Sequence, residues 1–141
     1  YCNGVKTAIN KVIETIINPN TPRPIYLLGS IIHNKNVNQE FIKMGAIIIE
    51  DKNKTRLELL DKIESGTVIF SAHGVCDKVY EKAIKKGLNI VDTTCGNVKV
   101  VHNKISKHIK EGYTCIYIGN KKHPECEGIL ENNSNIINNR K

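Results

Sequence analysis

Apolar residues recur at two different spacings along this chain, and the alternation between the two spacings predicts the fold class. Short, mostly apolar runs that end at a glycine or a polar loop are typical of buried parallel strands. Between these runs, apolar residues spaced three and four apart indicate amphipathic helices. The predicted strands are Ile25–Leu28, Ala46–Ile49, Thr67–Phe70, 89–91 and 115–118.

The predicted helices fill the intervals between these strands. The first spans residues 4–17 and is stopped by the prolines that follow it, and the longest spans residues 97–111. Three others have apolar faces over 37–44, 57–63 and 79–84, and a glycine ends each of them. This alternation predicts an α/β fold of parallel sheets flanked by helices. The Asn-rich segment 131–141 shows neither period, so no strand or helix is predicted there.

The amino-acid composition narrows the kinds of partner and ligand that the chain is expected to bind. The 141 residues contain no apolar run long enough for a membrane-spanning helix, so no membrane partner is expected. The net charge of +7 favours anionic partners. A nucleic-acid partner is not expected, because the chain has no Trp, only 5% aromatic residues and no recognised binding motif. A nucleotide is disfavoured because neither GxGxxG nor GxxxxGK[ST] occurs.

Reactive side chains follow the predicted strands at the points where those strands end. His33, His73 and Cys95 come shortly after the first, third and fourth strands, and His123 with Glu125 follows the fifth. Ligands of open parallel sheets bind outside the carboxyl ends of the strands. We therefore expect these residues to converge at one edge of the sheet.

Two of the five cysteines, Cys2 and Cys95, lie close to a glycine at the predicted start of a helix. A helix N-terminus favours a thiolate, so the two could hold a metal centre. They could equally be small buried hydrophobic residues, and their spacing does not decide between these interpretations. For the other three, burial in the core is the stronger interpretation, and Cys115 in particular is predicted to be a core residue of its strand. These three are Cys76, Cys115 and Cys126.

The histidines are also open to more than one interpretation. His73 and His123 lie in predicted loops, where an imidazole could bind an anion, transfer a proton or simply bond to the backbone; loop positions favour function. Glu125 could donate a proton or could merely favour the first turn of a helix. His102 and His108 fall on or beside the apolar face of the longest predicted helix and are interpreted as structural.

Five segments, in order over residues 1–128, resemble the 4-hydroxy-3-methylbut-2-enyl diphosphate reductases, the last enzymes of the non-mevalonate isoprenoid pathway. The segments are YCNGV at 1–5, LGSIIHN at 28–34, VIFSAHGV at 68–75, DTTC at 92–95 and GNKKHPECEG at 119–128. This resemblance implies a three-lobed α/β fold around a 4Fe–4S cluster, which three cysteines hold, one from each lobe. Residues 1–94 would form the first lobe, and 95–141 would begin a truncated second lobe.

The resemblance also implies roles for individual residues. Cys2 and Cys95 match two of the three cluster ligands, and the third is expected beyond this chain. The three histidines of the family's diphosphate pocket match His33, His73 and His123, and its proton-delivering glutamate matches Glu125.

The implied reaction is the reductive removal of an allylic hydroxyl group, with two electrons and two protons, to give isopentenyl and dimethylallyl diphosphates. The implied electron donor is an acidic ferredoxin or flavodoxin, and the implied location is the bacterial cytoplasm or a plastid-type organelle. With two of three cluster cysteines, the isolated chain is expected to be inactive. A non-catalytic anion-binding α/β module and an inactive truncated product of the same family are the alternatives.

Overall fold

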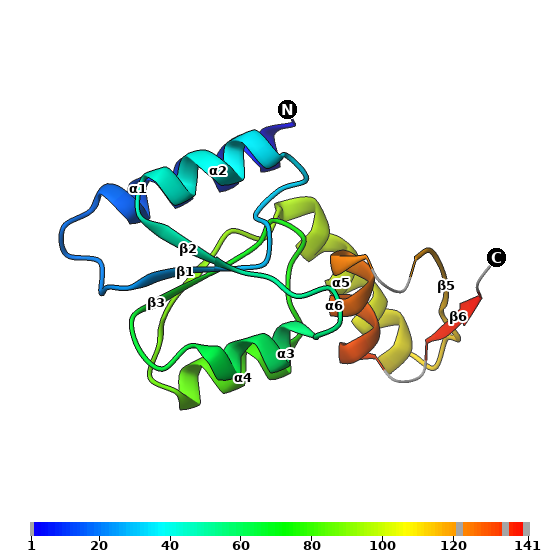
Figure 1. Cartoon of the computed structure of the whole chain (residues 1–141). Helices are drawn as coiled ribbons and strands as arrows, with labels where there is room; N and C mark the ends of the chain where they lie inside the picture. The colour runs from blue at the N-terminus through cyan, green and yellow to red at the C-terminus, as the bar shows by residue number, and fades with distance from the viewer. Residues whose placement is uncertain (1, 121–122, 134–135, 140–141) are drawn as a thin grey trace.

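The computed structural model of the chain describes residues 2–120, 123–133 and 136–139. Its centre is a four-stranded parallel sheet in the order β2-β1-β3-β4 (Figure 1). The strands are β1 (Ile25–Leu28), β2 (Ala46–Ile49), β3 (Thr67–Phe70) and β4 (Asn89–Asp92). The first residue of each strand pairs with the first residue of its neighbour, so all the carboxyl ends lie level at one edge.

Helices cover both faces of this sheet, which confirms the predicted α/β class (Figure 1). One face carries α1 (Asn3–Ile17) and α2 (Lys35–Lys43). The other carries α3 (Arg56–Leu59), a 3₁₀ turn (Leu60–Lys62) and α4 (Asp77–Lys85). Each face has its own apolar core, and β3 is buried along its whole length because it contributes to both. No helix among the described residues is long and apolar enough to cross a membrane.

The predicted strands β1, β2 and β3 are confirmed at every residue, and the helix predicted over 57–63 is the least accurate. Its region is a single α turn followed by the 3₁₀ turn. The turn begins at a capping box, in which the Thr55 side chain accepts from the Glu58 backbone and Glu58 accepts from the Thr55 backbone. At Ile63 the backbone is already extended and leads toward β3.

The second part of the chain contains α5 (Gly96–Lys110), β5 (Ile116–Ile118), α6 (Pro124–Asn132) and β6 (Ile137–Asn139). Strands β5 and β6 form a separate parallel pair beside the ends of α5 and α6 (Figure 1). The prediction that segment 131–141 lacks regular structure is therefore wrong for Glu131, Asn132 and Ile137–Asn139. The residues of β6 show no regular spacing of apolar positions. They form a strand because they pair with β5, which is distant in sequence.

The prediction that Cys115 is a core strand residue is also wrong. Cys115 is half-buried and precedes β5. On this strand Ile116 and Ile118 are 62% and 85% exposed, so β5 lies at the surface among the described residues. Helix α5 likewise buries none of its residues completely.

Strand β3 should dominate the stability of the first part of the chain. Ile69, fully buried in the middle of β3, contacts the core on the α1 side of the sheet. Replacing Ile69 with alanine should lower the free energy of unfolding by about 2–5 kcal/mol, because it removes buried methyl groups and leaves a cavity. The same change at Ile84, which is 65% exposed on α4, should cost less than about 1 kcal/mol. Urea unfolding of both variants tests this, and equal losses would contradict it.

Candidate functional site

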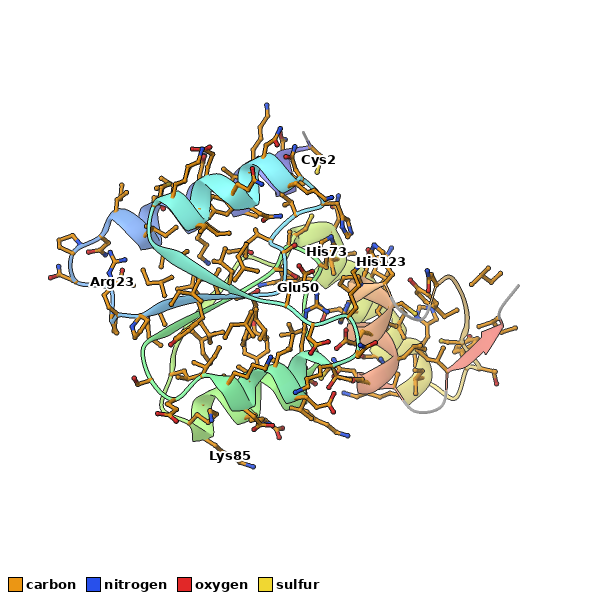
Figure 2. The ribbon with its side chains drawn as sticks, viewed as in Figure 1. Cys2, Arg23, Glu50, His73, Lys85 and His123 are labelled. Carbon is orange, nitrogen blue, oxygen red and sulfur yellow. The ribbon has the colours of Figure 1, made fainter. Side chains whose placement is uncertain are left out.

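Three imidazoles meet at the carboxyl edge of the central sheet. His33 follows β1, His73 follows β3, and His123 is the N-cap of α6. Their ring centroids are 4.4 Å (His33–His73), 5.2 Å (His33–His123) and 5.5 Å (His73–His123) apart. Figure 2 shows His73 and His123 close together beside α6. The expected convergence of these three side chains, which we call the imidazole trio, is confirmed.

The loops that carry the first two imidazoles are fastened to each other and to α2. The Asn38 side chain accepts from the Ile31 backbone and donates to the Ile32 carbonyl, which holds the loop before His33 against α2. The backbone N–H of Ala72 donates to the Ile31 carbonyl, so the loop before His73 lies alongside it. Next to His73, Gly74 has a φ of +82°, a conformation that favours glycine.

The position of His123 fixes which of its ring nitrogens carries the proton. The backbone N–H of Glu125 donates to His123 Nδ1 at 3.2 Å, so Nδ1 acts as the acceptor of a helix cap. In the neutral ring the proton then lies on Nε2, which is 3.1 Å from His33 Nε2. The trio also has the spacing of a metal site, with its ligand atoms within 4.8 Å of one another. However, Nε2 of His123 offers a proton rather than a lone pair, so it suits an anion better than a cation.

Burial and neighbouring positive charge keep His73 neutral. Burial is the largest influence, and together with the charges of His33, His123 and Arg56 it lowers the pKa of His73 from 6.5 to about 4. Nδ1 of His73 is buried and has no hydrogen-bond partner among the described residues. A bound anion would supply the negative charge that favours the protonated ring.

Two cavities flank the imidazole trio, and both are lined by His33 and His73. The first, of about 320 Å³, is mainly apolar and reaches Cys95; its other lining residues are Val5, Ile32, Asn34, Ala72 and Val98. The second, of about 370 Å³, is more polar; its other lining residues are Ser30, Ile32, Asn34, Lys35, Asn38, Glu50, Arg56 and Pro124. His33 and His73 thus line both a cavity that reaches a thiol and a cavity with several charged groups.

Cys2 and Cys95 occupy matching positions at the starts of two helices. Cys2 is the N-cap of α1 and Cys95 is the N-cap of α5, and neither thiol makes a capping hydrogen bond. A Cβ atom on Gly4 would lie only 2.3 Å from Cys95 Sγ, so the Cys95 thiol rests against the first turn of α1 where only glycine leaves room. Uncommitted thiols at helix N-termini fit the thiolate ligands of an iron–sulfur cluster.

The loop before Cys95 is well ordered by hydrogen bonds. The Asp92 carboxylate accepts from the Thr94 backbone at 2.8 Å and forms an ion pair with Lys99. The backbone N–H of Cys95 donates to the Ala72 carbonyl, which ties this loop to the one that carries His73. The loops that carry Cys95, His73 and His33 are therefore joined to one another by backbone hydrogen bonds.

Two other cysteines, Cys76 and Cys126, are buried, as expected. Cys76 donates a hydrogen bond from its thiol to Glu131, and burial followed by this bond raises its pKa to about 12. Cys126 is 0% exposed within α6. Cys76 therefore lacks the character of a reactive thiolate.

Glu125 lies in the first turn of α6, but it lines neither of the two cavities. Its charge acts on His102 of α5, whose pKa is lowered by burial and partly restored by Glu125. Nε2 of His102 is buried and has no hydrogen-bond partner among the described residues. His108 is exposed and its ring nitrogen Nδ1 bonds the Lys104 carbonyl.

The sequence interpretation missed Arg56 and Glu127. The Arg56 guanidinium lines the polar cavity and forms an ion pair with Glu127, 71 positions along the chain, at 2.8 Å. The capping box before Arg56 could have indicated a helix start. No local pattern indicates its partner on α6.

The family model described as LytB protein matches residues 1–141. The chain belongs to the LytB family. Among curated members it is 47% identical over 130 residues to the 4-hydroxy-3-methylbut-2-enyl diphosphate reductase of Geobacillus thermodenitrificans, with 92% of this chain and 40% of the relative covered. The enzyme of the same name from Symbiobacterium thermophilum is 48% identical, with 92% and 43% covered.

Solved structures of LytB relatives have the same fold. The E-1-hydroxy-2-methyl-but-2-enyl-4-diphosphate reductase from Plasmodium falciparum superimposes with a TM-score of 0.83 and 34% identity, covering 100% of this chain and 41% of that one. A second structure, titled (E)-4-hydroxy-3-methyl-but-2-enyl diphosphate reductase, gives a TM-score of 0.77 and 31% identity, covering 98% and 47%. The chain thus spans about two fifths of the length of the curated relatives cited above.

Proposed function

We propose that this chain supplies the diphosphate pocket and two cluster ligands of a 4-hydroxy-3-methylbut-2-enyl diphosphate reductase. The observation that carries the proposal is the position of the imidazole trio, beside a mainly apolar cavity that ends at Cys95. An allylic diphosphate has one charged end and one apolar end. The trio would bind the charged end, and the cavity would direct the apolar end toward the thiol.

In this proposal the imidazoles act as hydrogen-bond donors to the diphosphate. His123 already directs an Nε2 proton toward the trio, since its Nδ1 is occupied by the helix cap. His73 would be protonated when the anion binds, because the anion offsets the effects that keep it neutral in the free chain. Donors with a positive charge bind anions more strongly than neutral ones.

Cys2 and Cys95 would hold two corners of a 4Fe–4S cluster, with the third cysteine outside this chain. The two thiols fit that role because both residues occupy N-cap positions and neither thiol makes a capping hydrogen bond. Such a cluster supplies electrons and, through an open iron, a Lewis acid for the substrate hydroxyl group. Glu125, two residues after His123, is the proposed proton donor.

The basic surface of α5 is the proposed docking face for an acidic ferredoxin- or flavodoxin-type electron donor. Residues 93–124 carry six lysines and a single acidic residue, Glu111. Four of the lysines lie on α5, where Lys99 and Lys107 pair with Asp92 and Glu111. The proposed location is that of the family, the bacterial cytoplasm or a plastid-type organelle.

Binding of substrate fragments tests the anion pocket directly. In calorimetric titrations, the 141-residue chain should bind dimethylallyl diphosphate and inorganic diphosphate, and should not bind dimethylallyl alcohol. Replacing His33 with alanine should weaken diphosphate binding about 10-fold or more, because a charge-assisted hydrogen bond contributes about 1.5–3 kcal/mol. His108→Ala is the matched control, because His108 is exposed on α5. Binding that is equal for the alcohol and the diphosphates would overturn the proposal.

A further inference from the structure

Helix α6 is attached to the first part of the chain by a partly buried carboxylate. Oε1 of Glu127 accepts from the backbone N–H of Arg56 at 2.9 Å, and Oε2 accepts from Arg56 Nη1 at 2.8 Å. The side chains of Arg56 and Glu127 are only 10% and 20% exposed. Arg56 is the first residue of α3, so Glu127 also satisfies one of the backbone donors that a helix N-terminus leaves unpaired.

One turn further along α6, a second contact of the same kind is made with α4. The Glu131 carboxylate accepts from the Cys76 thiol at 2.9 Å, and Asn132 Oδ1 accepts from the Asp77 backbone at 2.8 Å. Cys76 is the N-cap of α4 and makes no capping bond within its own helix. Helix α6 thus supplies acceptors to the N-termini of both α3 and α4.

The first of these two contacts lies next to the imidazole trio. The backbone N–H of Glu127 donates to the His123 carbonyl at 3.0 Å, so the two residues belong to the same helical turn. His123 in turn places Nε2 at 3.1 Å from His33 Nε2. The Arg56 guanidinium lines the polar cavity together with His33, His73 and Pro124, the residue after His123.

We propose that Glu127 is a positioning residue, which, through Arg56, holds the first turn of α6 so that His123 completes the anion pocket. This inference rests on the proposed diphosphate binding by the imidazole trio. His123 comes from a segment that begins about 50 residues after the loop of His73. Its imidazole therefore reaches the other two only if α6 docks in the right place, and the Arg56–Glu127 pair is a docking contact within one helical turn of His123.

The test compares Glu127→Gln with Glu131→Gln in the 141-residue chain. Glutamine at 127 keeps an acceptor for one bond but places an amide donor against the donors of Arg56. Calorimetry should show inorganic diphosphate binding about 10-fold weaker in Glu127→Gln, the loss typical of a residue that orients a ligand. Glu131→Gln keeps an acceptor for the Cys76 thiol and should bind within about twofold of the unchanged chain. In NMR spectra of ¹⁵N-labelled imidazoles, the His123 signals should shift and those of His108 should not.

A double variant keeps the test decisive if Glu127→Gln does not fold. Removing one member of a buried ion pair is strongly destabilising, whereas replacing both by apolar residues is often tolerated. Arg56→Met with Glu127→Leu should therefore fold and still bind diphosphate about 10-fold more weakly than the unchanged chain. Full affinity in a folded Glu127→Gln chain or in the double variant would overturn the inference, as would an equal loss in Glu131→Gln. Failure of the unchanged chain to bind diphosphate would instead overturn the proposed function.

Discussion

Replacing Cys95 with serine is expected to abolish the ability of this chain to take up an iron–sulfur cluster. The chain offers two of the expected protein ligands, so a small external thiol is needed to supply the others. Under anaerobic reconstitution with iron, sulfide and such a thiol, the unchanged chain should develop broad visible absorption and bind iron and sulfide. The Cys95 variant should show neither the absorption nor the bound iron and sulfide, because the serine alcohol does not replace the cysteine thiolate as a ligand for the cluster iron.

The positions of the cysteines explain why only two of the five should be needed for cluster formation. Cys2 and Cys95 lie at helix N-termini where neither thiol makes a capping hydrogen bond, and Cys95 Sγ lies against Gly4 of α1. Cys2→Ser should therefore have the same effect as Cys95→Ser. Cys115→Ser is the matched control, since Cys115 is a free and half-buried thiol that lines neither cavity beside the imidazole trio. Cluster formation that survives both Cys2→Ser and Cys95→Ser, but not Cys115→Ser, would exclude the proposed ligand set.

Much of this site could be predicted from the order of strands and reactive residues. His33 and His73 follow β1 and β3, which are neighbours in register, so the edge they share could be inferred from local patterns alone. The same reasoning placed Cys95 near them, and the hydrogen bond from its backbone to the Ala72 carbonyl confirms that placement. These residues are predictable because parallel strands of equal length bring their carboxyl ends together.

Contacts that join α6 to the rest of the molecule could not be predicted in this way. The Arg56–Glu127 pair spans 71 positions, and neither residue stands out in a charged chain. Strand β6 depends wholly on pairing with β5. For the ion pair and for β6 the partner is distant in sequence, and the local spacing of apolar residues carries no information about it.

Lowering the pH from about 6.5 to about 4 is expected to destabilise the unliganded chain through His73. The pKa of His73 is about 4 in the folded chain, against 6.5 for an unperturbed imidazole. In this pH window the unfolded chain therefore binds a proton that the folded chain does not, so the free energy of unfolding decreases as the pH falls. Urea unfolding across the window should show a smaller decrease in His73→Asn. Identical pH profiles for the variant and the unchanged chain would show that His73 is not held neutral by the fold.

Bound diphosphate should have the opposite effect on His73 and favour its protonated form. The pH dependence of diphosphate binding therefore tests whether the anion lies in the proposed pocket. An anion within the trio favours the protonated ring, so the pKa of His73 should be higher in the complex than in the free chain. Binding then takes up a proton, and affinity should rise by up to about tenfold per pH unit as the pH falls between the bound and free pKa values. Inorganic diphosphate itself also titrates, so the informative quantity is the difference between the unchanged chain and His73→Asn at each pH. Calorimetry in buffers of different ionisation enthalpy measures the proton uptake directly. If both chains take up the same number of protons on binding, the anion does not lie against His73, and the pocket proposed for the substrate must be elsewhere.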